Sequence, residues 1–102
     1  MKTILLCCAA GMSTSMLATN MSSEAGKKGM EVVVKAIPIQ ELEAGLGEAD
    51  MVLLGPQVHY ELKRITALAE PLGKPVGVID RMDYGALRGD KILEHALGLL
   101  KK

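Results

Sequence analysis

The residues with the clearest chemical potential follow the first apolar run of the chain. This segment reads Cys8-Ala9-Ala10-Gly11-Met12-Ser13-Thr14-Ser15. Alanine and glycine let a backbone curl so that its N–H groups converge on an anion, and hydroxyls where a helix begins can cap it and donate to that anion. The N–H groups and the helix dipole also stabilise a thiolate. The segment therefore predicts a nucleophilic sulfur at Cys8 beside an anion-binding loop, where a phosphoryl group can be held covalently.

Other phosphate chemistry fits this loop less well. A Walker-type loop needs a lysine, and a dinucleotide fingerprint needs three glycines where this loop has only Gly11. Thiol phosphatases of the low-molecular-weight type need an arginine at the position of Thr14. Without that cation we expect a cysteine that keeps its phosphoryl group for another acceptor. The residues alone leave three functions open: a phosphoryl carrier, an anion-binding regulatory module that transfers nothing, and a thiol phosphatase.

The cysteines do not form a redox or metal motif. Neighbours on a strand point to opposite faces, so a bridge between Cys7 and Cys8 would be strained, and a redox pair needs the spacing C-x-x-C. Cys7, Cys8, His59 and His95 also lack the spacing of zinc ligands. We therefore expect no metal or organic cofactor, and we expect Cys7 to lie in the core. Two free thiols also fit a protein located in a reducing cytosol.

The elements that must position Cys8 alternate between strands and helices. Near-continuous apolar runs predict buried strands at Ile4–Cys7, Val32–Ile37, Met51–Leu54 and Val76–Ile79. Helical spacing predicts helices at Thr14–Lys28, Ile39–Leu46, Tyr60–Leu72 and Asp90–Leu100, with Gly29 ending the first. The inward residues are Leu17, Met21 and Ala25; then Leu62, Ile65, Ala69 and Leu72; and finally Ile92, Leu93, Ala96, Leu97 and Leu100. This alternation predicts an α/β fold with a parallel sheet, right-handed crossovers and helices on both faces.

In such a sheet, ligands bind beyond the carboxyl ends of the strands. The segments 8–15, 55–60 and 80–85 follow three predicted strands and are the candidate site. We expect Pro56, Gln57 and Tyr84 to form a wall of the site or a partner surface, or else to pack their loops. The other polar residues have structural interpretations: a cap or partner contact for His59, solvent for His95, turn caps for Asp80 and Asp83, and a solvated face for Glu41, Glu43, Glu48 and Asp50.

The composition disfavours several classes of partner. The 102 residues carry 12 basic and 12 acidic side chains, so no net charge attracts nucleic acid or anionic lipid. Two tyrosines, without phenylalanine or tryptophan, are too few to stack bases or sugars. The longest apolar run, residues 4–10, is far shorter than the roughly 20 residues of a membrane span and is expected to be a strand, not a secretory signal. The length predicts one domain over residues 1–102.

Three pieces of the chain together resemble a known family. They are the Cys8–Ser15 loop, the segment Val52-Leu53-Leu54-Gly55-Pro56-Gln57-Val58, and Val78-Ile79-Asp80 with Asp83-Tyr84-Gly85. In length, order and spacing the whole chain closely resembles the cytoplasmic IIB subunits of the lactose/cellobiose/chitobiose type in the bacterial phosphoenolpyruvate-dependent sugar phosphotransferase system. The cysteine loop combined with the Leu-Gly-Pro-Gln segment is quite specific to that family.

The resemblance implies a single IIB-type domain with a four-stranded parallel sheet in flavodoxin-like order 2-1-3-4, similar to low-molecular-weight tyrosine phosphatases. It implies that Cys8 accepts a phosphoryl group from a phosphohistidine of a IIA subunit and passes it to a sugar at the membrane IIC subunit. The backbone of residues 9–15 would receive the phosphoryl oxygens, assisted by the hydroxyls of Ser13, Thr14 and Ser15. At Cys7 the family commonly has another apolar residue.

The same resemblance implies a cytoplasmic protein that reaches the membrane only transiently, through IIC. A monomer suits such a shuttle. Its partners would be IIA and IIC, without nucleic acid and without membrane insertion, and Met12 and Met16 would either form an apolar rim for these encounters or fill the core. The sugar is a family-level expectation: a β-linked disaccharide such as cellobiose, chitobiose or lactose.

Overall fold

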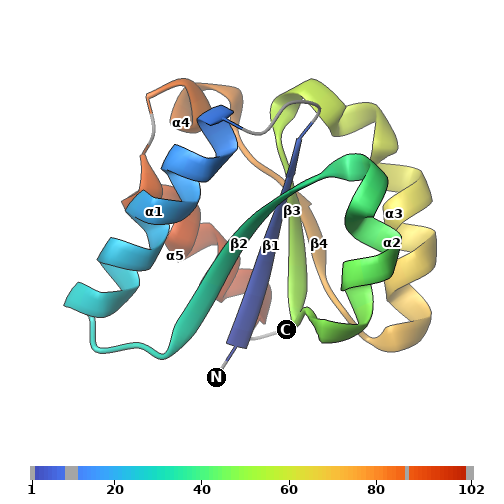
Figure 1. The fold of residues 1–102 in the computed structure, drawn as a ribbon, viewed down its shortest axis with the longest axis horizontal. Helices are drawn as coiled ribbons and strands as arrows, with labels where there is room; N and C mark the ends of the chain where they lie inside the picture. Colours follow the sequence, from blue (N-terminus) through green and yellow to red (C-terminus); the bar gives the residue numbers. More distant parts are fainter. Residues whose placement is uncertain (1, 9–11, 87, 101–102) are drawn as a thin grey trace.

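The apolar runs of the sequence form the strands of one parallel sheet. The computed structural model describes residues 2–8, 12–86 and 88–100. Strand β1 (Lys2–Cys8) pairs on one side with β2 (Val32–Pro38) and on the other with β3 (Met51–Leu54). Strand β4 (Val76–Val78) pairs with the far side of β3, which gives the order β2-β1-β3-β4 (Figure 1). The predicted α/β class and the order 2-1-3-4 are confirmed.

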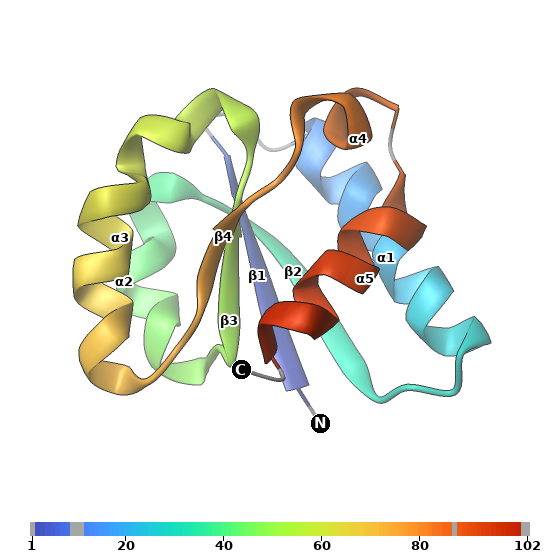
Figure 2. The ribbon, with the colours of Figure 1, turned by 180° about the vertical axis from the view of Figure 1, so that it is seen from behind.

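Helices cover both faces of this sheet, as Figures 1 and 2 show. The helices α1 (Met12–Lys27) and α5 (Gly89–Leu100) lie on one face, and α2 (Leu42–Gly45) and α3 (Leu62–Ala69) lie on the other. The short helix α4 (Arg81–Gly85) follows β4. Four 3-10 helices complete the connections: η1 (Ile39–Glu41), η2 (Leu46–Glu48), η3 (Pro56–Glu61) and η4 (Glu70–Leu72). None of the helices within the described ranges has the length and apolar character that crossing a membrane requires.

The central strand β1 contributes alternate side chains to two separate apolar layers. Ile4 and Leu6 belong to the layer beneath α1 and α5. Leu5 and Cys7 belong to the layer beneath α2 and α3. Each of these four side chains is at most 4% exposed. Burial of one such aliphatic side chain contributes roughly 1.5–3 kcal/mol, so a shift of register by one residue would disrupt both layers together.

The first helix lies nearly where the sequence predicts it. It begins at Met12 instead of Thr14 and ends at Lys27. Leu17, Met21 and Ala25 are buried as expected, each at 1% exposure or less. Gly29 adopts a left-handed φ of 69° just beyond the helix, which confirms its predicted role as the stop.

The predicted helix over residues 60–72 is wrong at both ends. The chain forms η3, then α3, then η4, and the expected inward residues Leu62 and Leu72 are 38% and 55% exposed. Pro71 has no N–H to continue the helical ladder, so α3 ends before it, and Gly73 then turns the chain with a φ of 69°. Ile65 and Ala69 are the parts of the predicted stripe that are buried.

Two further predictions need correction. The predicted helix over residues 39–46 contains only the four α-helical residues of α2, flanked by η1 and η2, because glycine in a short helix is unfavourable. The segment 80–85, predicted as a loop, contains α4. The final helix begins at Gly89 and buries Ile92, Leu93 and Ala96 as predicted, whereas Leu97 is half-buried. The side chain of Leu100 lies outside the described residues.

Helix α5 packs closely against α1 at Gly89. A Cβ atom built on Gly89 would lie 2.8 Å from the Cβ of Asn20 and 2.9 Å from the backbone nitrogen of Met21. A real Cβ does not tolerate such distances to backbone atoms, so the absence of a side chain at Gly89 is what lets the two helices meet. Gly98, later in α5, has nothing within 4 Å of the same position.

We therefore predict opposite effects for two alanine substitutions in α5. Gly89→Ala should lower the free energy of unfolding by about 1–3 kcal/mol, because the helices must separate. Gly98→Ala should raise it by up to about 1 kcal/mol, because alanine is the better helix former. Urea unfolding followed by circular dichroism measures both. Equal stability of Gly89→Ala and the parent chain would show that the two helices are not in close contact.

Candidate functional site

The candidate site lies at the carboxyl ends of β1, β3 and β4, which meet at one end of the sheet. Two backbone hydrogen bonds hold the segments after these strands together. Gly55 N donates to the carbonyl of Cys7 at 2.8 Å, and Ile79 N donates to the carbonyl of Leu54 at 2.8 Å. The start of η3 is thereby fastened to β1 directly before Cys8, as the predicted parallel topology requires.

The cysteine loop is only partly described. Ala9, Ala10 and Gly11 lie outside the described residues. Cys8 is the last residue of β1 and Met12 the first of α1. The side chains of Cys8, Met12, Ser13 and Thr14 are likewise outside the description, so their predicted roles stay predictions.

The residues flanking this loop are described. Cys7 is fully buried at 0% exposure, in the layer beneath α2 and α3, as expected of a core residue. Ser15 is exposed, and its carbonyl accepts a hydrogen bond of 3.1 Å from the hydroxyl of Thr19. Met16 is 58% exposed, so of its two predicted roles the structure favours the rim over the core.

A cavity of about 410 Å³ lies between η3 and α4, beside the end of β1. It is lined by Pro56, Gln57, Arg81, Tyr84 and Gly85. Pro56, Gln57 and Tyr84 are predicted from the sequence to form a wall of the site or a partner surface, or else to pack their loops, and all three line this cavity. Gln57 is exposed, whereas Tyr84 is 7% exposed and belongs to the apolar layer beneath α1 and α5.

Arg81 and Met82 lie in the predicted site segment 80–85, but neither was singled out from the sequence as a functional residue. Both lie in α4, and Met82 is 81% exposed. The available signal was Asp80, since an aspartate at the end of a strand is a favoured helix N-cap.

Helix α4 is held at its start by Asp80. The carboxylate of Asp80 accepts hydrogen bonds from the backbone N–H groups of Met82 at 3.0 Å and Asp83 at 3.2 Å. The predicted capping role of Asp80 is thus confirmed. Among the described residues, the carboxylate of Asp83 accepts no comparable bond. Its backbone carbonyl accepts a hydrogen bond of 2.9 Å from Arg88 N.

The remaining polar residues lie mostly in solvent. His59 and His95 are exposed, and the rings of His59 and Tyr60 meet edge to face at 6.2 Å. Glu41, Glu43 and Glu48 are exposed as predicted. Asp50 departs from that prediction, because it is half-buried and accepts a hydrogen bond of 2.7 Å from Thr3 N. Within the described ranges, no cluster of histidine, cysteine and carboxylate side chains is arranged to hold a metal ion.

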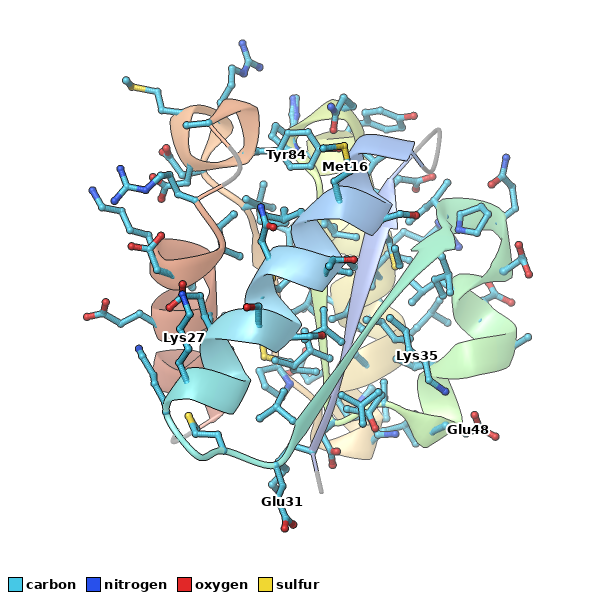
Figure 3. All side chains as sticks on the ribbon, turned by 60° about the vertical axis from the view of Figure 1, so that its left-hand side comes forward. Met16, Lys27, Glu31, Lys35, Glu48 and Tyr84 are labelled. Carbon is cyan, nitrogen blue, oxygen red and sulfur yellow. The ribbon has the colours of Figure 1, made fainter. Side chains whose placement is uncertain are left out.

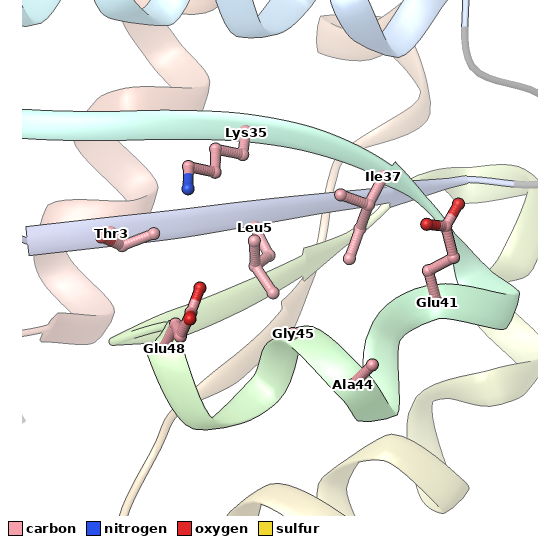
Figure 4. A pocket seen from close by; sticks show the side chains of 8 residues that line it. All are labelled: Thr3, Leu5, Lys35, Ile37, Glu41, Ala44, Gly45 and Glu48. Carbon is pink, nitrogen blue, oxygen red and sulfur yellow. The ribbon is translucent and has the colours of Figure 1, made fainter.

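A second cavity, of about 320 Å³, lies along the sheet between β1, β2 and the α2 region (Figure 4). Its apolar lining includes Leu5 and Ile37, and Lys35 and Glu48 extend from its two sides. Leu5 and Lys35 are paired in the middle of the two strands. This cavity runs along the face of the sheet, and it shares no lining residue with the cavity between η3 and α4.

Comparison with known proteins identifies a group of close relatives. The family model described as the lactose/cellobiose-specific IIB subunit of the phosphotransferase system (PTS) matches residues 3–95. The galactose-specific EIIB component of Lactococcus lactis subsp. cremoris (strain MG1363) is 41% identical, over 97% of this chain and 96% of its own. The cellobiose-specific EIIB component of Lactococcus lactis subsp. lactis (strain IL1403) has the same identity and coverage. The oligo-beta-mannoside-specific EIIB component of Bacillus subtilis (strain 168) is 39% identical, over 98% of this chain and 97% of its own.

Solved structures show the same architecture. The lactose-specific IIB component domain from Streptococcus pneumoniae superposes with a TM-score of 0.87 over 96% of both chains, at 23% identity, which is a likeness of fold. The cellobiose-specific phosphotransferase IIB component from Borrelia burgdorferi superposes with a TM-score of 0.80, at 36% identity, over 98% of this chain and 92% of that one.

We predict that the cap at Asp80 stabilises the start of α4. Asp80→Ala should lower the free energy of unfolding by about 0.5–2 kcal/mol, because two backbone N–H groups lose their acceptor. It should also speed hydrogen exchange at the amides of Met82 and Asp83. Asp80→Asn keeps an acceptor oxygen at this position and should stay close to the parent chain in both measurements. If Asp80→Ala leaves the exchange of these two amides unchanged, the cap does not hold α4 in solution.

Proposed function

This chain belongs to the lactose/cellobiose-specific IIB subunits of the PTS, a sugar-specific component that acts in phosphoryl transfer, and from that membership we propose that Cys8 is its phosphoryl-accepting residue. Cys8 takes the group from a phosphohistidine of the IIA subunit and passes it to a sugar bound at the membrane IIC subunit. The observation that carries this proposal is the burial of Cys7 at the end of β1, which leaves Cys8 as the thiol next to the loop.

The alternation of β1 supports the choice between the two thiols. Leu5 and Cys7 lie in the layer beneath α2 and α3, and Ile4 and Leu6 lie in the layer beneath α1. The period of a strand therefore predicts that the residue after Cys7 belongs to the α1 side. That is the side on which the next helix begins.

The start of α1 supports the choice of an anion as the bound group. Helix α1 has 16 residues and begins at Met12, shortly after Cys8. Its first N–H groups have no partners within the helix, and together they carry the positive end of the helix dipole. No acidic residue stands in the first turn of α1 to oppose an anion there. A thiolate and the phosphoryl oxygens it carries are both stabilised by this arrangement.

The transfer then consists of two displacements at phosphorus. In the first, the Cys8 thiolate attacks the phosphohistidine of IIA, so that an S–P bond forms, the N–P bond breaks and the leaving imidazole takes up a proton. In the second, a sugar hydroxyl at IIC attacks the same phosphorus and loses its proton, and the S–P bond breaks to restore the thiolate. The chain's task is to hold the group in line and to delay attack by water.

The sugar class rests on the relatives. Proteins about 40% identical to this chain are named for galactose, cellobiose and oligo-β-mannosides. We propose a β-linked disaccharide as the sugar that finally accepts the phosphoryl group. The described residues offer no aromatic platform for a sugar ring beyond Tyr60 and the buried Tyr84, which agrees with a sugar site on the membrane partner.

Two single substitutions test Cys8. After incubation with phosphorylated IIA, the parent chain should gain the mass of one phosphoryl group, and Cys8→Ser should lose acceptance by at least about 10³-fold, because a serine hydroxyl is not ionised near neutral pH. Cys7→Ala should still accept the group. Intact-mass spectrometry with time gives the rates, and thermal unfolding confirms that both variants are folded.

The same assay separates the other functions. Equal labelling of both variants would overturn the assignment to Cys8. Rapid release of inorganic phosphate by the isolated chain would favour a thiol phosphatase. Binding of phosphate without a covalent label would favour a regulatory module.

A further inference from the structure

The arginines of the chain differ in whether they form an ion pair with a carboxylate. Arg64 forms ion pairs with Glu61 at 2.9 Å and Glu43 at 3.2 Å. Arg88 pairs with Asp90 at 3.3 Å, and this hydrogen-bonded guanidinium lowers the pKa of the Asp90 carboxyl. Arg81 is exposed and has no ion pair with any of the described residues.

Arg81 lies at the candidate site, unlike Arg64 and Arg88. It lines the cavity between η3 and α4 together with Pro56 and Gln57. Pro56 follows Gly55, whose N–H is bonded to the carbonyl of Cys7, the residue before Cys8. The hydrogen bonds of the described chain therefore connect the wall opposite Arg81 directly to the end of β1.

Three large apolar side chains are exposed on the segments that follow the strands at this end of the sheet. Met16, Tyr60 and Met82, which are 58%, 71% and 81% exposed, follow β1, β3 and β4 respectively at this end of the sheet. Figure 3 shows Met16 and Tyr84 at one end of the molecule and Lys27 towards the other. The carboxylate that precedes Arg81 in the sequence, Asp80, accepts two backbone hydrogen bonds as the cap of α4. Arg81 is thus an exposed cation at an end of the sheet where large apolar side chains are exposed as well.

We propose that Arg81 binds the phosphorylated face of the IIA donor and draws its phosphoryl group toward Cys8. This inference rests on the proposed function, since it names a contact of the same site with the same donor. Arginine suits this role because its planar guanidinium matches phosphate oxygens with paired donors. The partner contributes a phosphoryl group that carries a charge of about −1.5 to −2 near neutral pH, which complements the guanidinium of Arg81.

The neutral charge of the whole chain makes cations close to the site important. With 12 basic and 12 acidic side chains, the chain has no net field that would attract an anionic partner from afar. Attraction must then come from local charges near the site, within the Debye length of roughly 10 Å at 0.1 M salt. A rim charge of this kind acts on the rate of association and on its dependence on salt.

The test is the second-order rate constant for phosphoryl transfer from phosphorylated IIA, measured by rapid quench at several salt concentrations. Arg81→Gln should lower this rate constant about three- to tenfold at low salt, near 0.01 M, and the difference should nearly vanish by about 1 M. Arg81→Lys keeps the charge and should retain most of the rate. A purely structural role would not give an effect that disappears with salt.

Lys28→Gln is the matched control, because it also removes one positive charge from an exposed side chain. Lys28 follows the last residue of α1, Lys27, at the far end of that helix from Cys8. The control should keep the parent rate constant at every salt concentration.

The outcomes separate this inference from the proposed function. If the parent chain accepts the group on Cys8 and Arg81→Gln does so at the same rate at every salt concentration, the role of Arg81 is overturned and the carrier function stands. If Arg81→Gln slows only the later transfer to sugar at IIC, the choice of IIA as its partner is overturned. If the parent chain accepts no phosphoryl group, both proposals fall.

Discussion

The period of two along β1 is the constraint on which the rest of the structure depends. This strand lies in the middle of the sheet, with β2 and β3 on its sides and helices above and below. Its successive side chains go to different apolar layers, and both layers are closed to water. Since neither layer tolerates a polar group without a partner, the chain cannot slip along its neighbours, and the place where β1 ends is fixed. Each segment of the candidate site is in turn fastened to that place by backbone hydrogen bonds.

Much of this arrangement follows from local patterns in the sequence. The runs at Ile4–Cys7 and Met51–Leu54 are short and apolar throughout, which favours strands buried on both faces, and the structure confirms both. The spacing of Leu17, Met21 and Ala25 likewise gives the buried face of α1. These predictions succeed because side-chain burial, the largest favourable term in folding, decides them.

The failures occur where a small local term decides instead. Leu72 fits a helical stripe by spacing, but Pro71 and the left-handed Gly73 turn the chain away and expose it. Asp50 was predicted as one of several solvated acids, yet its carboxylate accepts a hydrogen bond from Thr3 N and is half-buried beside the central strand β1. A functional role for Arg81 could not be predicted from the sequence, because arginine is common in turns. Its position became informative only once the partners of Arg64 and Arg88 were known.

Lys35 on the outer strand has a consequence for how copies of this chain meet. The outer edge of β2 pairs with no other strand of the described residues, and three consecutive valines precede Lys35 on that strand. Such an edge is a template on which a second molecule can extend the sheet. The exposed ammonium group of Lys35 would lose its hydration in that contact. Lys35 therefore opposes edge-to-edge pairing between copies of the chain. For the proposed carrier, which must leave each partner quickly, such an edge has the advantage that it discourages self-association.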